Sequence, residues 1–210
     1  MFIELIDALR CTNAHRDSWL VTAIIERDDR IIRVGTLGCP VCQREYPILD
    51  GVALFGVDPA TGVVRHETHA AEPSGNDDAM LLGALLAVAE GATIAVTGRW
   101  ASAAVALTGV LPVRAFIVNP DARRDDSERT GIIRSSEGIP LAAGSLRGVA
   151  LDDGNVSERD VASALRALAP GARLVAPATT PQPPELAEIA RDEQWWVAEK
   201  PRALVSLRRH

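Results

Sequence analysis

The chain has 210 residues, of which 47% are hydrophobic but only 4% aromatic, and its formal net charge is -6. A core made of Ala, Val, Leu and Ile favours buried parallel strands covered by helices, the α/β class. Acidic and basic residues are interspersed along the chain, which disfavours direct nucleic-acid binding because no broad positive surface is expected.

The cysteine content and the start of the chain indicate a cellular compartment. Three cysteines, two of them in a spacing typical of metal sites, argue against a disulfide framework and for a reducing environment. Glu4 and Asp7 follow Met1 closely, which argues against a secretory signal, and no apolar run reaches membrane-spanning length. We expect a soluble cytoplasmic protein without a membrane contact.

The first part of the chain predicts a small module over residues 1–57. Apolar residues at helical spacing predict a short helix over 2–10. Residues 19–25 and 30–34 flank a polar turn and predict a β-hairpin. A single further strand over 48–55 is expected to close the module.

Two pairs of metal-binding side chains lie within this module. Cys39 and Cys42 are two residues apart, so a tight turn presents both sulfurs to one metal ion. Cys11 and His15 offer a second pair upstream. The sequence therefore predicts a structural, tetrahedral zinc site of Cys11, His15, Cys39 and Cys42. An ordinary buried thiol with a surface imidazole, or a redox pair at Cys39 and Cys42, is the alternative interpretation.

The same residues carry a resemblance to a known family. The segment 3–11, the Cys-Pro-Val-Cys knuckle at 39–42 and the Tyr-Pro-Ile-Leu-Asp-Gly-Val run at 46–52 resemble the zinc-ribbon family of small methyltransferase activators, such as the activator subunit of tRNA methyltransferases. Members of this family also occur fused to methyltransferase domains. Where the family has a second thiol in its first knuckle, this chain has Ala14, so the resemblance implies that His15 takes its place.

A linker is predicted after the module. Residues 58–75 lack apolar periodicity and accumulate Gly, Pro, Ser and Asn. His66 and His69 lie in this stretch, and we interpret them as part of a solvated loop because no third ligand lies near them in the sequence.

From residue 76 to the C-terminus, helical and strand patterns alternate. This alternation implies parallel strands joined by right-handed crossovers, and the last two strands predict an antiparallel hairpin. Ser157 is expected to cap a helix, with Asp160 at its third position. Helices are predicted over 76–89, 101–107, 157–168 and 185–191, and strands over 93–96, 115–118, 131–133, 148–151, 173–176, 195–198 and 204–207.

This second part resembles the class I S-adenosylmethionine-dependent methyltransferases. Residues 137–149 are similar to the segment that follows the third strand of that family, and residues 164–175 to its helix, Pro-Gly turn and fifth strand. The expected fold is therefore α/β, with a small N-terminal zinc ribbon and a doubly wound, mostly parallel sheet that ends in an antiparallel hairpin.

The resemblance also implies where a cofactor would bind, and the chain departs from the family at three strand ends. An acid and glycines are expected after the first strand, but only Gly98 is close to a glycine position. The acids expected after the second and third strands fall at Asn119 and Ser135. These three residues are the remaining candidates for S-adenosylmethionine binding, and we expect the cofactor not to bind because Arg99 and Trp100 would fill the pocket.

Asp152 and Asp153 follow the strand predicted over 148–151, where methyltransferases often place residues that face the methyl acceptor. A paired acid there fits a general base, and it also fits a solvated loop before the Ser157 cap, which we favour.

Taken together, these patterns favour a non-catalytic zinc-binding protein with a degenerate methyltransferase-like domain, and we assign no catalytic residue. We expect it to act as an accessory subunit through a protein partner or as a homo-oligomer. The alternatives are an active S-adenosylmethionine-dependent methyltransferase acting on RNA, protein or a small molecule, and an activator subunit of a separate methyltransferase.

Overall fold

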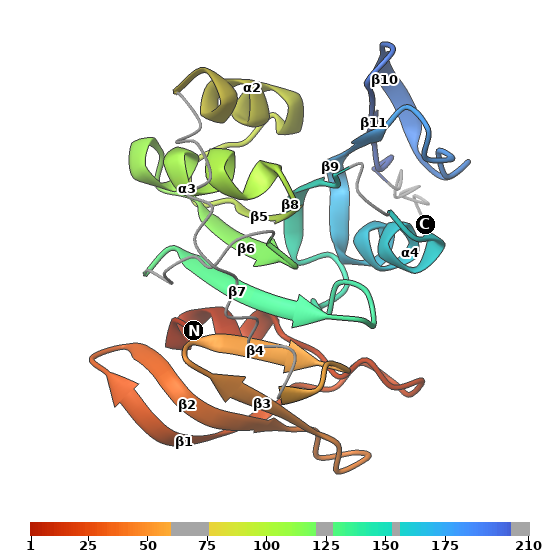
Figure 1. The fold of residues 1–210 in the computed structure, drawn as a ribbon. Helices are drawn as coiled ribbons and strands as arrows, with labels where there is room; N and C mark the ends of the chain where they lie inside the picture. Colours follow the sequence, from red (N-terminus) through yellow and green to blue (C-terminus); the bar gives the residue numbers. More distant parts are fainter. Residues whose placement is uncertain (60–75, 121–127, 153–155, 203–210) are drawn as a thin grey trace, which may run out of the picture.

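The computed structural model describes residues 1–59, 76–120, 128–152 and 156–202. Within these ranges, eleven strands form one sheet in the order β1-β2-β3-β4-β7-β6-β5-β8-β9-β11-β10 (Figure 1). The elements are η1 (Ile3–Ala8), β1 (Val21–Asp28), β2 (Ile31–Gly38), β3 (Glu45–Leu49), β4 (Val52–Phe55), α2 (Asn76–Leu86), β5 (Thr93–Thr97), α3 (Trp100–Val110), β6 (Arg114–Val118), β7 (Thr130–Ser135), β8 (Leu146–Ala150), α4 (Glu158–Ala167), β9 (Leu168–Pro177), β10 (Ala187–Arg191) and β11 (Trp195–Glu199).

The middle of the sheet is parallel, as the sequence predicted. The six strands β4-β7-β6-β5-β8-β9 pair in parallel, and the strand order reverses direction between β5 and β8. Such a reversal is the topological switch point of doubly wound sheets, where the loops that leave the two strands run in opposite directions and leave a crevice between them. The sheet as a whole is mixed, because the pairs on both flanks are antiparallel, so the expected mostly parallel sheet is found only in this central part.

The N-terminal strands belong to the same sheet. β4 pairs in parallel with β7, and the register places Val52 opposite Ile132 and Phe55 opposite Ser135. The β1–β4 meander therefore continues directly into the α/β half. The division into a ribbon at 1–57 and a domain at 76–210 stays a prediction, but in this structure the two segments share backbone hydrogen bonds.

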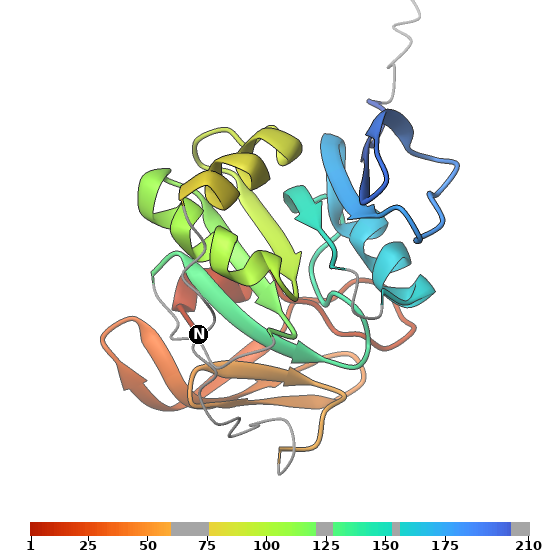
Figure 2. The same cartoon turned by 45° about the horizontal axis from the view of Figure 1, so that its top comes forward.

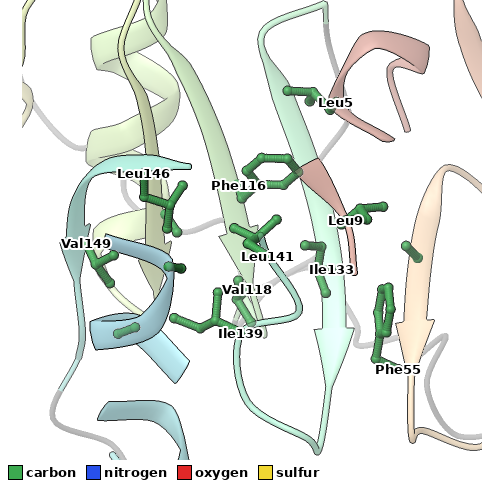
Figure 3. Close-up of a cluster of buried hydrophobic side chains, with 14 of the residues drawn as sticks. Leu5, Leu9, Phe55, Phe116, Val118, Ile133, Ile139, Leu141, Leu146 and Val149 are labelled. Atoms are coloured by element: carbon green, nitrogen blue, oxygen red, sulfur yellow. The ribbon is translucent and has the colours of Figure 1, made fainter. Parts of the chain in front are cut away.

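Side chains that alternate along the central strands point into two hydrophobic clusters, one on each face. Ile94 and Val96 of β5 pack with α2 and α3, whereas Ala95 between them belongs to the opposite cluster. The opposite face is covered by η1 and α4 (Figure 2). In Figure 3, Leu5 and Leu9 from the N-terminal segment lie beside the strands that carry Phe116 and Ile133.

The N-terminal segment takes the place of a crossover helix. Residues 136–145, which join β7 to β8, contain no helix, and the space over β7 is filled by η1. Gly131 allows this close approach, since a Cβ there would lie 2.9 Å from Cδ1 of Leu5. Leu9 forms an antiparallel bridge with Leu141, so the chain leaves the helical conformation after Ala8 and the helix expected over 2–10 is a shorter 3-10 helix.

Two sequence-based predictions are wrong for identifiable reasons. The single strand expected over 48–55 is a hairpin, because Asp50 and Gly51 have positive φ angles of 49° and 81°, which suit a two-residue turn. The helix expected over 185–191 is strand β10. β11 has an outer edge with backbone groups available for pairing, and that tertiary partner outweighs the helical preference of an Ala- and Glu-containing segment.

The remaining elements agree with the prediction where they are described. The hairpin expected over 19–34 is β1 and β2, and the Ser157 cap with Asp160 forms a reciprocal capping box on α4. An antiparallel C-terminal hairpin is present, but β10 and β11 form it. The strand predicted over 204–207, the two histidines of the linker and most of the linker itself lie outside the described residues. None of the helices in the described ranges has the length and apolar character that a membrane crossing requires.

Candidate metal centre

Four side chains that are far apart in the sequence meet at one point beside the first strands. Cys11 and His15 come from the segment between η1 and β1, and Cys39 and Cys42 come from the turn between β2 and β3. Their ligand atoms all lie within 4.8 Å of one another. The structure therefore brings together the four residues that the sequence singled out, as a group that can hold a metal ion.

The turn that carries the second pair is closed by its own backbone. The N–H of Cys39 donates to the carbonyl of Arg44 at 2.8 Å, and the N–H of Gln43 donates to the carbonyl of Cys39 at 2.9 Å. Gln43 has a φ angle of 59°, which lets the chain turn back toward β3. This conformation points Cys39 inward, where it is buried, and leaves Cys42 exposed.

The distances between the ligand atoms match a tetrahedral zinc site. Cys11 Sγ lies 3.6 Å from Cys42 Sγ, and Nε2 of His15 lies 3.2 Å from Cys11 Sγ and 3.4 Å from Cys39 Sγ. Sulfur and nitrogen ligands bound to zinc at about 2.3 Å and about 2.0 Å are roughly 3.5 to 3.8 Å apart at the corners of a tetrahedron. These three distances lie within tenths of an ångström of the tetrahedral values, and the other pairs of ligand atoms are no more than 4.8 Å apart.

The orientation of His15 is set by a backbone carbonyl. Its Nδ1 lies 2.7 Å from the carbonyl oxygen of Arg16, which can only accept a hydrogen bond. Nδ1 is thereby assigned the proton, and the lone pair of Nε2 faces the three sulfurs. This contact also raises the pKa of His15.

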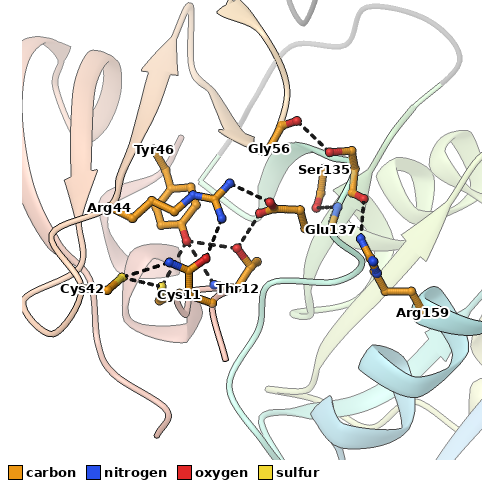
Figure 4. A network of polar contacts seen from close by, with 11 residues as sticks. Cys11, Thr12, Cys42, Arg44, Tyr46, Gly56, Ser135, Glu137 and Arg159 are labelled. Carbon is orange, nitrogen blue, oxygen red and sulfur yellow. Dashed lines mark hydrogen bonds and ion pairs between the residues drawn. The ribbon is translucent and has the colours of Figure 1, made fainter. Parts of the chain in front are cut away.

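Polar groups around the sulfurs connect the centre to the rest of the fold (Figure 4). The hydroxyl of Tyr46 lies 3.1 Å from Cys11 Sγ, and it accepts a hydrogen bond of 3.1 Å from the N–H of Thr12. The hydroxyl of Thr12 donates to Glu137 at 2.5 Å. Asn13 donates from Nδ2 to Cys42 Sγ at 3.3 Å. Contacts of this kind orient metal ligands. Glu137 has no sequence signal for this role, because it lies more than a hundred residues after Thr12.

The environment of the thiols makes them unequal. The pKa of Cys42 is lowered to about 6, first by a hydrogen bond from the backbone of Arg44 and also by the one from Asn13. Burial raises the pKa of Cys11, and it raises the pKa of Tyr46 as well. Near neutral pH the thiolate form is therefore favoured at Cys42 and disfavoured at Cys11.

A cleft of about 510 Å³ borders the centre, between the N-terminal segment and α4. This volume is in the range of small-molecule pockets. The cleft contains three guanidinium groups and two carboxylates, and its ion pairs join Arg44 to Glu137 and Arg166 to Asp17. Its lining residues include Cys11, Thr12, Asn13, His15, Asp17, Arg44, Glu137, Arg159, Ser163 and Arg166.

The candidate cofactor residues lie at the carboxyl ends of neighbouring strands, and two of them bond to each other. Asn119 donates from Nδ2 to the carbonyl of Ser135 and accepts from the N–H of Ser135, both at 2.8 Å. The Ser135 hydroxyl accepts from the N–H of Glu137 at 3.1 Å. Nδ2 and Oδ1 of Asn119 thus both form hydrogen bonds to the backbone of Ser135. At this position the methyltransferase resemblance implies an acid that accepts hydrogen bonds from the ribose of the cofactor.

The third candidate, Gly98, lies under a carboxylate. Gly98 has a φ angle of 50°, and a Cβ at this position would overlap the carboxylate of Asp152. Asp152 accepts a 2.6 Å hydrogen bond from the N–H of Arg99, so it caps the turn after β5. The guanidinium of Arg99 lies 4.2 Å from the ring centre of Trp195. Asp152 is therefore held by its own chain, while its neighbour Asp153 lies outside the described residues.

Comparisons with known proteins find partial structural matches only. No protein-family model and no curated protein matches the chain. Among solved structures, the 4+2 cyclase SpnF matches with 14% identity over 48% of this chain and 43% of its own, at a TM-score of 0.41. A putative methyltransferase from an antibiotic biosynthesis pathway of Anabaena variabilis matches with 17% identity over 47% and 43%, at 0.40. Geranyl diphosphate C-methyltransferase from Streptomyces coelicolor, solved with Mg²⁺, geranyl diphosphate and S-adenosyl-L-homocysteine, matches with 18% identity over 48% and 44%, at 0.40. The chain spans less than half the length of these proteins, and matches of this extent assign neither a family nor an activity.

Proposed function

We propose that this chain is a zinc-stabilised, non-catalytic accessory protein that acts through contacts with another protein. The observation that carries the proposal is the internal bonding at the strand ends, where Asn119 bonds to Ser135 and Asp152 bonds to the turn at Gly98. In this proposal the zinc centre holds the N-terminal meander, and the α/β half serves as a scaffold.

The ligand set supports a structural rather than a catalytic zinc ion. Three thiolates and one imidazole fill the four positions of a tetrahedron, whereas catalytic zinc sites keep one position open for water or substrate. Cys11 and Cys39 are buried, with 5% and 2% of their surface exposed, which also suits a closed site. The proposed ion would hold the segment after η1 against the turn between β2 and β3.

The switch point supports the loss of cofactor binding. Ligands of doubly wound sheets bind outside the carboxyl ends of the strands where the order reverses, here between β5 and β8. Asp152 and Arg99 each lie two residues after the end of a strand, β8 and β5 respectively, and a hydrogen bond from the Arg99 N–H to the Asp152 carboxylate joins them across this point. A nucleoside in that place would have to break this bond and the paired bonds of Asn119, and each broken bond to a partly buried group costs roughly 1 to 3 kcal/mol.

Exposed apolar side chains support a protein partner. Val21 and Ile25 of β1 are 65% and 75% exposed, and Trp19 just before the strand is 73% exposed. Among the described strands β1 pairs only with β2, so its outer edge offers backbone groups to a partner. Apolar groups on a sheet edge are typical of surfaces that other proteins cover.

The second candidate is an active methyltransferase, and the retained strand order at the switch point is the observation that favours it. It would require Asp152 to leave the turn at Gly98. The third candidate is an activator of a separate methyltransferase. β4 already pairs with β7 of the same chain, so the edge of β1 would have to extend the partner's sheet.

Two measurements on the full chain test the proposal. Elemental analysis of protein purified without chelators should find about one zinc ion per chain. Isothermal titration with S-adenosylmethionine should give no binding heat, with an established methyltransferase as the positive control. A micromolar dissociation constant would refute the non-catalytic role and favour the second candidate, whereas a metal-free chain would refute the zinc centre.

A further inference from the structure

The four ligands of the centre are not equally protected from solvent. Cys11 and Cys39 are buried, whereas Cys42 is exposed and lies in a turn whose residues 40–43 are all exposed. A soluble oxidant can therefore reach the sulfur of Cys42 without any opening of the core. Exposure makes a thiolate susceptible to peroxide, and a cysteine that binds zinc does so as a thiolate.

A second sulfur is placed to react with an oxidised Cys42. Cys11 Sγ lies 3.6 Å away, and a disulfide needs a separation of about 2.05 Å, so the two sulfurs must approach by roughly 1.6 Å. The exposed turn can supply this movement, because the side chains of residues 40–43 are not packed in the core. Cys39 is buried, and its sulfur lies 3.4 Å from Nε2 of His15.

We infer that Cys42 and Cys11 form an oxidation-sensitive pair, which closes to a disulfide in the presence of hydrogen peroxide and releases the zinc ion. This inference rests on the proposed zinc centre. The thiolate of Cys42 attacks one peroxide oxygen, which breaks the O–O bond and gives a sulfenic acid and hydroxide. The thiolate of Cys11 then attacks the sulfur of Cys42, so the S–S bond forms, the S–O bond breaks and a second hydroxide leaves. The two thiolates lose two electrons in total, and the two hydroxides take up two protons from solvent, so one peroxide is reduced to two waters.

The consequence extends beyond the metal. Only Cys39 and His15 remain as ligands after the disulfide forms, and two ligands do not make a closed zinc site. Disulfide formation also removes the charge on Cys11 Sγ, which weakens its contact with the hydroxyl of Tyr46, and this hydroxyl bonds to Thr12 and through it to Glu137. The oxidation is therefore coupled to the loop after β7 and to the cleft beside α4, which Glu137 lines.

The test uses the zinc-loaded full chain, treated with hydrogen peroxide, with zinc release followed by a colorimetric chelator. Remaining thiols are blocked, and the disulfide is mapped by mass spectrometry without reduction. The expected result is a disulfide between residues 11 and 42, a blocked Cys39, and one zinc ion released for every two thiols lost. Dithiothreitol with added zinc should restore the starting state.

A pair of variants tests whether Cys42 is the sulfur that peroxide attacks. In the zinc-loaded chain Cys42 is a thiolate in either variant, and Asn13→Ala removes a hydrogen bond to its Sγ, which makes this sulfur more nucleophilic and should raise the rate of zinc release severalfold. The control Ser18→Ala changes the same segment at a hydroxyl that donates to the backbone carbonyl of Trp19, and it should leave the rate unchanged.

The outcomes separate the two proposals. A zinc-loaded chain that forms a disulfide between Cys39 and Cys42, links two chains, or loses thiols without losing zinc overturns this inference alone. Equal rates in the two variants also overturn it. A chain that holds no zinc overturns the proposed centre and the coupled release together.

Discussion

Arg44 donates from Nη2 to the carboxylate of Glu137 at 2.6 Å, across 93 residues of sequence. Arg44 follows the Cys39–Cys42 turn directly, and Glu137 lies in the loop after β7, so the pair joins the metal-binding turn to the α/β half. Arg44 also donates to Asn13 at 2.7 Å, and the contact with Glu137 raises the pKa of Arg44.

Replacing this carboxylate should destabilise the fold. Glu137→Gln removes the charge that accepts hydrogen bonds from Arg44 and Thr12, and we expect the free energy of unfolding to fall by about 2 kcal/mol. Urea denaturation followed by circular dichroism measures this change. Glu188→Gln, in an ion pair with Arg191 on the surface, is the control and should cost less than about 0.5 kcal/mol. Similar losses in both variants would refute a special role for the pair.

Removing a buried ligand should remove the metal. Cys39→Ser is expected to reduce the zinc content to below about a tenth of an ion per chain and to lower the melting temperature by about 10 °C or more, because metal binding contributes directly to folding. Val41→Ala changes an exposed residue of the same turn and should keep both the metal and the melting temperature. Elemental analysis measures the zinc content of both variants, and thermal melts measure their melting temperatures. A Cys39→Ser protein that still contains zinc would contradict the assignment of Cys39 as a zinc ligand.

A side chain at Gly98 should be tolerated only without Asp152. Gly98→Ala combines an unfavourable positive φ with a clash against the Asp152 carboxylate, and it should destabilise the protein by about 3 kcal/mol. In an Asp152→Gly background, which removes the Cβ of residue 152 as well as the carboxylate, the same change should cost only about 1 kcal/mol, which a double-mutant cycle in urea measures. Gly109→Ala, in α3 with open space around it, should be neutral or slightly stabilising. Additive effects at 98 and 152 would show that the carboxylate does not occupy this space.

Zinc affinity should fall as the pH is lowered. Protons compete with zinc for the ligands, burial raises the pKa of Cys11, and the contact with the Arg16 carbonyl raises the pKa of His15. Both groups therefore retain protons to higher pH than free side chains do, and the affinity should drop at least about a hundredfold between pH 8 and pH 6. Competition with a chelator of known affinity measures it. An affinity that is constant over this range would argue against thiolate and imidazole ligands.

Local patterns predicted much of the fold and the grouping of the metal ligands. The core strands β5 to β9 carry apolar runs that only a buried sheet can use, and Ser157 with Asp160 forms a cap within four residues of sequence. Cys39 and Cys42 lie close together because only two residues separate them, and a tight turn of this length directs both sulfurs to one side. Asp50 and Gly51 form an Asp-Gly pair, which is a sequence signal for a two-residue hairpin turn. This turn divides the strand expected over 48–55 into two strands.

What the sequence determined by itself is the set of short-range features: the apolar strands, the capped helix and the close spacing of Cys39 with Cys42. The tertiary structure decided the pairing of β4 with β7 and the contacts of Glu137 with Arg44 and of Asp152 with Arg99. The physical reason is distance along the chain. A hydrogen bond between residues fifty or more positions apart depends on how the whole sheet is assembled, and no local preference records that assembly.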